Sequence, residues 1–300
     1  MPVKRNNISA VDFNKPTVFC KDVLAFLSSL PETAIFDLTV TSPPYDIGKV
    51  YERRVPLEEY AAWQQTIIEE VCKRTKPNGS VCWQVGNWVD KGTIWPLDIL
   101  LAPIFRDCGM KLRNRIVWHF GHGTHAKTRF SGRYETILWF TKGDEYTFNL
   151  DAVRIPSKYP GKRHFKGERK GELSGNPLGK NPEDVWDIPN VVGNHVEKTA
   201  HPCQFPVGLV SRLVRALSNP GDLVFDPFTG SGTTAVAALS EGRRFVGTEV
   251  AQKYVKIALS RIDRTLSGTE VWRPAEKPIY DYRKSHLSER PKEWGVCNEV

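Results

Sequence analysis

The sequence predicts an α/β fold in which helices cover both faces of a doubly wound, mostly parallel sheet. Short apolar runs with the length of buried strands alternate with segments of helical periodicity near both ends of the chain. Between these parts, residues 149–201 show no sustained period and are rich in glycine, proline, lysine and asparagine. We therefore expect a small irregular insertion in an otherwise regular sheet protein.

Six regular elements are predicted before this insertion. Residues 36–41 form an apolar run that ends in Ser-Pro-Pro, as expected for a buried strand stopped by proline. Residues at helical spacing predict a helix over 57–73, and the sequence Lys-Pro-Asn-Gly predicts a turn at 76–79. The other predicted elements are a helix over 95–108, with Pro103 at a kink or in the first turn, and strands over 80–85, 115–120 and 136–140.

The alternation resumes after the insertion. Helical spacing predicts a helix over 206–217, the sequence Asn-Pro-Gly predicts a turn at 219–221, and an apolar run predicts a strand over 223–225. A helix over 233–240 and a strand over 244–249 follow. The tail is polar and interrupted by prolines, and we assign no element to it.

The composition is that of a globular protein. Hydrophobic residues make up 40% and charged residues 25% of the 300 residues, which excludes a disordered chain or a coiled coil. No apolar run approaches the ~18 residues of a membrane span, and the N-terminal residues lack the apolar core of a secretory signal. The six cysteines form no C-x-x-C pair, which argues against a disulfide framework or a zinc knuckle. We expect a cytoplasmic protein that does not contact the membrane.

The charge favours a polyanionic partner. Forty-two lysines and arginines against thirty-four acids give a net charge of +8. Residues 111–133 hold six basic residues, three histidines and no acid, and residues 158–170 hold six basic residues and a single acid. Two such runs indicate contact with a phosphate backbone, the alternative being two solvated loops.

A glycine-rich turn follows the predicted strand at 223–225. The sequence Asp-Pro-Phe-Thr-Gly-Ser-Gly-Thr-Thr over 226–234 leads into a helix, so a ligand could approach the backbone and the helix amides closely. The sequence fits neither a phosphate-binding P-loop nor the dinucleotide motif G-x-G-x-x-G. Glu249 ends the next strand, 17 residues after Gly232, close to the ~20 residues at which a carboxylate meets a ribose. This spacing fits an adenosine-bearing cofactor without a pyrophosphate, the alternative being a turn used only for tight packing.

A second turn, Ser42-Pro43-Pro44-Tyr45, ends the predicted strand at 36–41. The two prolines lack an N–H and hold the chain in an extended conformation. The turn therefore offers a hydroxyl and carbonyl oxygens that can accept hydrogen bonds from an amine, with an aromatic ring beside them. An ordinary proline turn without a function is the alternative.

Together the two motifs resemble the exocyclic-amino DNA methyltransferases, and in particular the circularly permuted β-class in which the catalytic motif precedes the cofactor motif. The resemblance extends from about residue 17 to residue 262 and includes the segments 133–142, 184–189 and 201–206. It implies a Rossmann-like methyltransferase fold. The implied division is a catalytic domain formed by 1–148 and 202–266, a target-recognition region at 149–201, and a C-terminal tail at 267–300.

The resemblance also implies the cofactor, S-adenosylmethionine, and the residues of the site. The turn at 226–234 would hold the methionine part, Glu249 the ribose hydroxyls, and Asp22 would lie near the adenine amine; the neighbouring Lys21 replaces a glycine that is frequent in the family. The implied cofactor residues are Asp22, Asp226, Phe228, Gly230, Ser231, Gly232, Thr233, Thr234 and Glu249. The implied catalytic residues, which would line the pocket for the target base, are Ser42, Pro43, Pro44 and Tyr45.

Double-stranded DNA is the implied partner. A base inside a duplex cannot be reached, so the target must be flipped out, and Tyr45 is placed to stack on it. The DNA-binding residues predicted from the basic runs are Lys127, Arg129, Arg133, Lys162, Arg163 and Lys166. We expect no metal, because glycines between His119, His122 and His125 break any helix that would align them. The three histidines are expected in a loop that faces DNA.

Within the family, serine at the first catalytic position is more typical of cytosine-N4 enzymes and aspartate of adenine-N6 enzymes. Ser42 therefore favours methylation of cytosine N4 in a restriction-modification system, with adenine N6 as the alternative. A non-catalytic DNA-binding protein on this scaffold, and an RNA or protein-glutamine methyltransferase, are further alternatives. The recognition sequence, the oligomeric state and the presence of a partner restriction endonuclease stay open.

Overall fold

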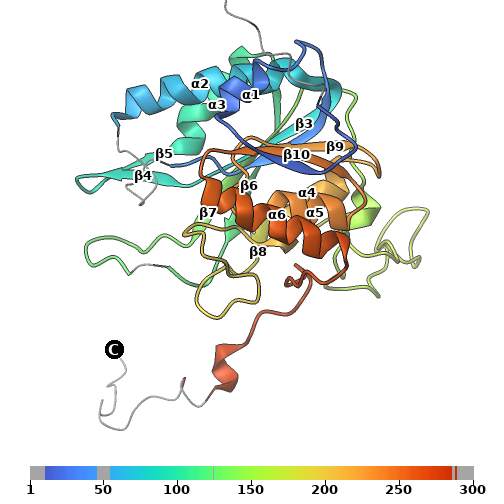
Figure 1. Cartoon of the computed structure of the whole chain (residues 1–300). Helices are drawn as coiled ribbons and strands as arrows, with labels where there is room; N and C mark the ends of the chain where they lie inside the picture. Colours follow the sequence, from blue (N-terminus) through green and yellow to red (C-terminus); the bar gives the residue numbers. More distant parts are fainter. Residues whose placement is uncertain (1–10, 46–54, 124, 286–287, 289–300) are drawn as a thin grey trace, which may run out of the picture.

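The computed structural model describes residues 11–45, 55–123, 125–285 and 288. These residues form three layers, with one large sheet between two layers of helices (Figure 1). The expected α/β class is thereby confirmed.

The described part of the sheet has eight strands in the order β1-β10-β9-β2-β3-β7-β6-β8. All neighbouring pairs are parallel except the two that β7 forms with β3 and β6. The sheet is therefore mostly parallel, as predicted, and β7 is its one reversed strand. The strand bounds are β1 Thr17–Cys20, β2 Phe36–Thr41, β3 Thr75–Val85, β6 Lys111–His119, β7 Tyr134–Thr141, β8 Val185–Asp187, β9 Leu223–Asp226 and β10 Arg244–Glu249.

Each face of the sheet has its own hydrophobic core. The first core packs α1, α2 and α3 against one face, and the second packs α4, α5 and α6 against the other. The helix bounds are α1 Val23–Leu27, α2 Leu57–Arg74, α3 Leu97–Asp107, α4 Val207–Leu217, α5 Thr233–Ser240 and α6 Gln252–Leu266, with short 3-10 helices at Leu150–Val153 and Tyr282–Lys284. No helix among the described residues combines the length and the hydropathy needed to cross a bilayer.

The elements predicted from periodicity are all present, with one correction. The helix expected over 95–108 begins at Leu97, because the residues before it form a hairpin, β4 Asn87–Asp90 and β5 Thr93–Pro96. The turn of this hairpin has positive φ at both Lys91 (45°) and Gly92 (87°). Lysine is not typical of the first position of such a turn, so the sequence did not indicate the hairpin. Pro103 lies in the interior of α3 and not in its first turn, so of the two expected positions the kink stays a prediction.

The turn expected at 76–79 is a bulge within β3. Phe36 pairs with Thr75, whereas Leu38, two residues on, pairs with Ser80. Several elements outside the insertion had no prediction: β1, the five-residue α1, β4, β5, α6 and the 3-10 helix at Tyr282–Lys284. In α6 the buried residues Tyr254, Val255, Ala258 and Ile262 follow helical spacing, so this helix was readable from the sequence and was missed.

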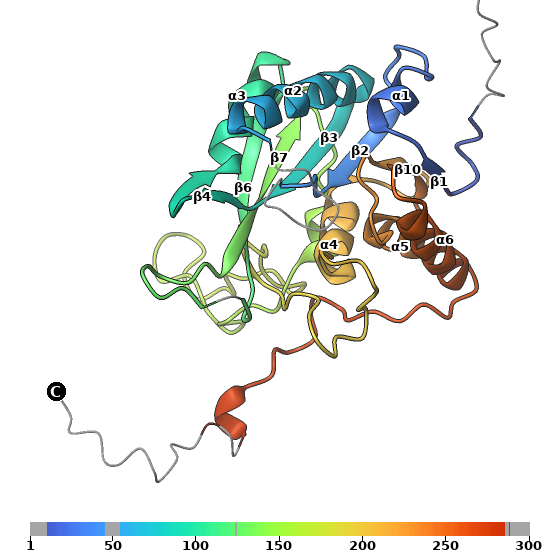
Figure 2. The same cartoon turned by 60° about the vertical axis from the view of Figure 1, so that its left-hand side comes forward.

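The order of the strands places both predicted motifs at one edge of the sheet. β2 lies beside β9 and parallel to it, so the turns that follow the two strands leave the sheet at the same carboxyl edge. The chain from β2 continues into α2 on one face, and the chain from β9 continues into α5 on the other. This is the arrangement in which open α/β sheets bind ligands, in the crevice between two connections that diverge. Figure 2 shows the divergence of α2 and α5 from the middle of the sheet.

The insertion at 149–201 is divided between the two edges of the sheet. The reversed strand β7 ends at Thr141, opposite Ser80 at the amino end of the regular part of β3, so the chain after it starts at the edge away from the site. Asn149 is fixed there by hydrogen bonds to the carbonyls of Ala216 (2.7 Å) and Ser218 (2.9 Å) at the end of α4. Strand β8, parallel to β6, then returns the chain to the carboxyl edge.

Phe225 joins the two halves of the sheet from within the first core. Its ring is fully buried and stacks on Phe36 of β2, with 4.3 Å between the ring centroids. Phe225→Ala should lower the free energy of unfolding by about 3–5 kcal/mol, because a cavity replaces the ring. Urea denaturation would measure the loss. Leu266→Ala, at a side chain that is 63% exposed, is the control and should leave the free energy of unfolding nearly unchanged.

Candidate active site

A cavity of about 470 Å³ lies at the carboxyl edge of the sheet, within the usual size range of small-molecule sites. It is lined by both predicted turns, by the chain after β10, and by the part of the insertion that follows β8. The site residues predicted from the sequence that line it are Asp22, Ser42, Pro43, Pro44, Tyr45, Phe228, Gly230, Ser231, Thr233 and Glu249. The cavity therefore brings together the cofactor motif and the catalytic motif.

Asp226 and Thr41 fix the two turns to each other. The buried Asp226 carboxylate accepts a hydrogen bond from the Thr41 hydroxyl (2.6 Å) and another from the Phe228 amide (3.0 Å). Burial raises the pKa of Asp226 to about 6, and the hydrogen bonds act in the opposite direction. Asp226 is thus behind the wall of the cavity and supports the turn from inside.

Two other predicted cofactor residues also lie behind the wall. Thr234 hydrogen-bonds through its hydroxyl to the Val40 carbonyl (3.4 Å), which ties α5 to β2. Gly232 has φ of +81°, and a Cβ there would lie 2.9 Å from the Cα of Ala258 on α6. Only glycine allows this conformation and this contact between the two helices. Neither residue lines the cavity.

Glu249 and the glycine-rich turn form the side of the cavity that fits a ribose. One carboxylate oxygen accepts from the Gly230 amide (3.0 Å) and the other from the Ala251 amide (2.8 Å). Each oxygen keeps a further lone pair, so the carboxylate can also accept from two adjacent hydroxyls. Burial raises the pKa of Glu249, while these amide bonds lower it. The chemistry of the carboxylate and of the closely approaching backbone suits a nucleoside with a ribose diol.

Arg261 of α6 braces the glycine-rich turn from behind. Its fully buried guanidinium donates to the Ser231 carbonyl and to the Thr233 hydroxyl (both 3.1 Å) and pairs with the buried Glu270 (2.7 Å). Glu270 also pairs with Arg264 (2.6 Å), whose side chain is half exposed. Through Arg261 the missed helix α6 determines the shape of the predicted turn.

The remaining walls of the cavity come from both faces of the sheet. Asp22 accepts from the Leu24 (2.9 Å) and Ala25 (3.1 Å) amides as the N-cap of α1. Phe228 packs against Trp63 of α2, with 5.6 Å between the ring centroids. His201 lies against Gly230, and burial lowers its pKa to about 4, so its imidazole is neutral at physiological pH.

The predicted catalytic turn at 42–45 is joined by hydrogen bonds to the middle of the sheet. The Ser42 and Tyr45 hydroxyls lie 3.2 Å apart, and the Tyr45 hydroxyl donates to Oε2 of Glu135 (3.3 Å). The same oxygen accepts from the side-chain amide of the buried Gln84. Burial raises the pKa of the Tyr45 phenol well above its usual value, and the Glu135 charge raises it further. The phenol therefore keeps its proton.

The structure adds wall residues that the sequence analysis did not assign to the site. Glu135 and His201 belong to segments that carried the family resemblance, so a signal for them was present although no role was given. Gln84, in the interior of a predicted strand, had no such signal. The unassigned wall residues discussed below are Gln84, Trp118, Phe120, Glu135 and Asn190.

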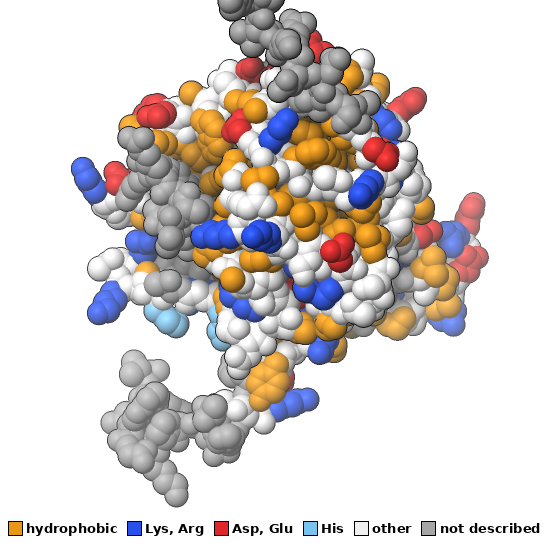
Figure 3. All heavy atoms as spheres, in the orientation of Figure 1, with side chains coloured by type: hydrophobic (Ala, Val, Ile, Leu, Met, Phe, Trp, Pro, Cys, Tyr) orange, Lys and Arg blue, Asp and Glu red, His pale blue; other side chains and the backbone are white. Residues whose placement is uncertain are grey.

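The loop at 119–133 extends from the carboxyl edge beside the cavity. Lys127 and Arg129 are exposed and Arg133 is half-buried. Figure 3 shows basic and histidine side chains gathered at the lower left of the molecule, where this loop lies in Figure 1. His119 hydrogen-bonds to Asp187. Among the described residues, no group of three or more histidine, cysteine or acidic side chains is arranged to hold a metal ion.

The first part of the basic run at 111–133 has a structural role. Lys111 and Arg113 pair with Asp144, and Arg115 pairs with the buried Asp98. These three cations lie along β6, before the loop, and their charges are matched by acids that the sequence places far away. Only the end of the run faces the edge where the cavity opens.

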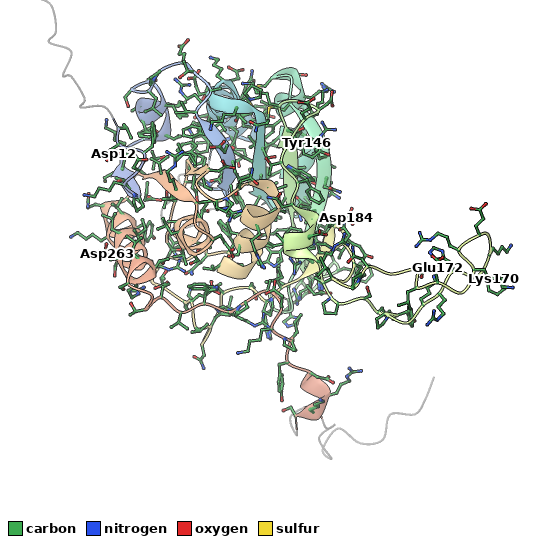
Figure 4. All side chains as sticks on the ribbon, turned by 90° about the vertical axis from the view of Figure 1, so that its right-hand side faces the viewer. Asp12, Tyr146, Lys170, Glu172, Asp184 and Asp263 are labelled. Carbon is green, nitrogen blue, oxygen red and sulfur yellow. The ribbon has the colours of Figure 1, made fainter. Side chains whose placement is uncertain are left out.

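The structure does not bring the second basic run to the site. Residues 157–178 form an arm in which short antiparallel contacts, such as that between Arg163 and Leu173, join the two sides. The arm leaves the body at the amino edge of the sheet, and Figure 4 shows Lys170 and Glu172 at its far end, beyond Asp184. In Figure 1 it lies on the opposite side from the 119–133 loop. The exposed cations of this arm include Lys162, Arg163 and Lys166, and their contact with DNA stays a prediction.

Comparisons with known proteins agree on one family. The sequence model of the DNA methylase family matches residues 36–260. The chain is 52% identical over 242 residues to the type II methyltransferase M.BglII of Bacillus subtilis, a match that covers 80% of this chain and 67% of the relative. It is 33% identical over 252 residues to the DNA adenine methyltransferase YhdJ of Escherichia coli K12, with 82% of each chain covered.

Solved structures show the same likeness. A putative DNA modification methylase from Thermus thermophilus, solved in complex with S-adenosyl-L-methionine, matches with a TM-score of 0.60 and 27% identity over 85% of this chain and 96% of its own. The cytosine-N4-specific PvuII DNA methyltransferase matches with a TM-score of 0.65 over 85% of this chain and 97% of its own. At 23% identity, this second match concerns the fold alone.

Arg261→Met should weaken binding of S-adenosylmethionine and lower the free energy of unfolding by about 3 kcal/mol, because it releases the turn and leaves Glu270 buried with one partner fewer. Arg264→Met is the matched control, since it removes the other partner of the same carboxylate without touching the turn. Calorimetry on the folded variants at low temperature would compare the affinities. Equal losses of affinity in both variants would contradict the bracing role of Arg261.

Proposed function

The chain belongs to the DNA methylase family of N6 and N4 methyltransferases, and we propose that it transfers a methyl group from S-adenosylmethionine to the exocyclic N4 amine of a cytosine flipped out of duplex DNA. The observation that carries the proposal is the meeting of two sites in one cavity. Glu249 and residues of the 226–234 turn line the same cavity as the hydrogen-bond acceptors of the 42–45 turn.

The arrangement suits the chemistry of an exocyclic amine. The lone pair of this nitrogen is delocalised into the base, so it is a weak nucleophile until its geometry changes. The Ser42 hydroxyl and the Pro43 carbonyl can accept its two N–H bonds and hold the nitrogen as it becomes tetrahedral. S-adenosylmethionine would supply an electrophilic methyl group. The N–C bond would form as the S–C bond breaks, the neutral thioether would leave without a general acid, and the methylated nitrogen would release one proton to water.

Ser42 supports cytosine N4 as the acceptor, because serine at this position is more typical of the cytosine-N4 enzymes. Adenine N6 is the alternative, and the identity to an adenine methyltransferase, YhdJ, favours it. The two bases differ in size and in ring hydrogen-bonding groups, while their amines are alike. Digestion of methylated mixed-sequence DNA to nucleosides, followed by identification of the modified base, decides between them.

The other classes of function receive less support. A DNA-binding protein without activity would not need the hydrogen bonds that fix Ser42 and Glu249 around one cavity. Transfer to a protein glutamine would leave the basic loop beside the cavity without a role. RNA carries the same phosphates as DNA, and the identity to DNA methyltransferases supports DNA over RNA. Methyl transfer to DNA in the same assay, with RNA and protein as competing substrates, separates these classes.

On the DNA side we propose that the 119–133 loop contacts the phosphate backbone near the flipped base. Two of its cations are exposed, and Phe130, between them and Arg133, is fully exposed to solvent. The identity to a type II methyltransferase supports a place in restriction-modification, and a restriction endonuclease is the proposed genetic partner. We place this activity in the cytoplasm.

Ser42→Ala should keep the affinity for S-adenosylmethionine and lower the rate of methyl transfer by roughly 10²–10³, because the missing acceptor matters most as the nitrogen becomes tetrahedral. Single-turnover transfer of a labelled methyl group measures the rate. Ser240→Ala, at an exposed serine at the end of α5, is the control. A wild-type rate for Ser42→Ala would mean that the amine is held elsewhere.

Replacing Lys127, Arg129 and Arg133 with alanine should weaken DNA binding and reduce the salt dependence of log K by roughly 0.9 for each phosphate that the protein no longer neutralises. Replacing Lys162, Arg163 and Lys166 should do the same only when the duplex is long enough to reach the opposite edge. Duplexes of about 12 and about 30 base pairs, at ~3.4 Å each, separate the two cases. An unchanged salt slope for both sets would remove both surfaces from the DNA interface.

A further inference from the structure

Hydrogen bonds link two side chains of the 42–45 turn to Glu135, which is in turn bonded to Gln84. Ser42 contacts Tyr45, Tyr45 contacts Glu135, and Glu135 also contacts Gln84. We propose that Glu135 is a positioning residue that acts through Tyr45 to make the Ser42 hydroxyl an acceptor toward the target amine. The inference rests on the proposed function, in which Ser42 contacts that amine.

The direction of these hydrogen bonds follows from the number of protons that each group can donate. A carboxylate can only accept, so the Tyr45 hydroxyl gives its one proton to Glu135. Tyr45 then has no proton left for Ser42, and the 3.2 Å contact between the hydroxyls must use the Ser42 proton. The Ser42 proton therefore points at Tyr45, and the lone pairs of its oxygen are left to face the cavity.

This polarity decides what the turn recognises. An exocyclic amine carries two N–H groups, so a hydroxyl that presents its own proton would repel it, whereas lone pairs attract it. Without the carboxylate, Tyr45 could donate to Ser42 instead, and the Ser42 proton would then be free to point at the base. Burial and the Glu135 charge both raise the pKa of Tyr45. The phenol therefore retains the proton that it donates to Glu135.

The fold holds Glu135 at this place through the reversed strand. Glu135 lies near the start of β7, next to Thr136, which pairs with Val85 at the end of β3. Gly86 follows, and a Cβ at that position would lie 3.2 Å from the Tyr45 ring and 3.3 Å from Oε1 of Glu135. Glycine thus lets the tyrosine and the carboxylate meet, although the sequence separates them by 90 residues.

The test is a double-variant cycle with Glu135→Met and Tyr45→Phe. Single-turnover methyl transfer to saturating DNA should be slower in Glu135→Met by roughly 10- to 100-fold, the range expected for hydrogen bonds to charged groups. KM for DNA and cofactor should stay within about twofold, since the acceptor acts in the transition state. Tyr45→Phe keeps the ring, and its rate of methyl transfer should fall by less than about tenfold, because the Ser42 oxygen can still accept a hydrogen bond from the amine.

The double variant gives the deciding result. With no phenol to reverse the polarity, it should transfer methyl groups faster than Glu135→Met alone and at about the rate of Tyr45→Phe. A purely structural role for Glu135 would instead make the double variant the slowest. Glu135→Gln, whose amide oxygen still accepts from Tyr45, should stay close to the wild-type rate.

Glu145→Met, the same change at an exposed position after the other end of β7, is the matched control, and cofactor affinity confirms that each variant is folded. A wild-type rate for Glu135→Met, or a double variant that is no faster than Glu135→Met, would overturn the inference. The proposed function would still stand in that case, provided that the wild-type protein methylates DNA. Absence of DNA methyl transfer by the wild-type protein would overturn both.

Discussion

The pairing of β2 with β9, closed by the hydrogen bond from Thr41 to Asp226, is the constraint on which the rest of the site depends. A buried carboxylate is costly unless its oxygens are occupied, and here a strand hydroxyl and an amide of the glycine-rich turn occupy one of them. The same oxygen therefore sets the distance between the two motifs. Because Asp226 holds its partners on both sides, the catalytic and cofactor turns are positioned together.

This constraint acts between strands and does not depend on their order in the chain. Thr41 and Asp226 are 185 residues apart, yet they are neighbours because their strands are. The circularly permuted order is compatible with the same site for this reason, since each strand carries its own turn and its own helix on one face of the sheet. The insertion between the two halves then has to cross from one edge of the sheet to the other, which β7 and β8 accomplish.

The sequence predicted what local pattern determines and missed what distant pairing determines. Apart from α6, the strands and helices with clear periodicity and the two turns were predicted within a few residues. The contact of Glu135 with Gln84 and Tyr45 depends on the register of β3 with β7, which no local pattern shows. The basic run at 158–170 reads like a DNA-binding loop in the sequence, but the reversed direction of β7 places it at the other edge. The lysines and arginines of β6 were misjudged for a similar reason, because Asp98 and Asp144 match their charges from other elements.

We propose that the 42–45 turn presents hydrogen-bond acceptors to the cavity. The prolines at 43 and 44 have no N–H to offer, and Gln84 and Tyr45 direct donors at Glu135. Such a turn selects an amine, which cytosine and adenine both carry, and cannot by itself choose between the bases. We propose that the choice falls to other residues of the cavity wall, which include Trp118, Phe120 and Asn190. In this proposal the sheet holds the groups that recognise the amine, and the loops that follow β6 and β8 recognise the base.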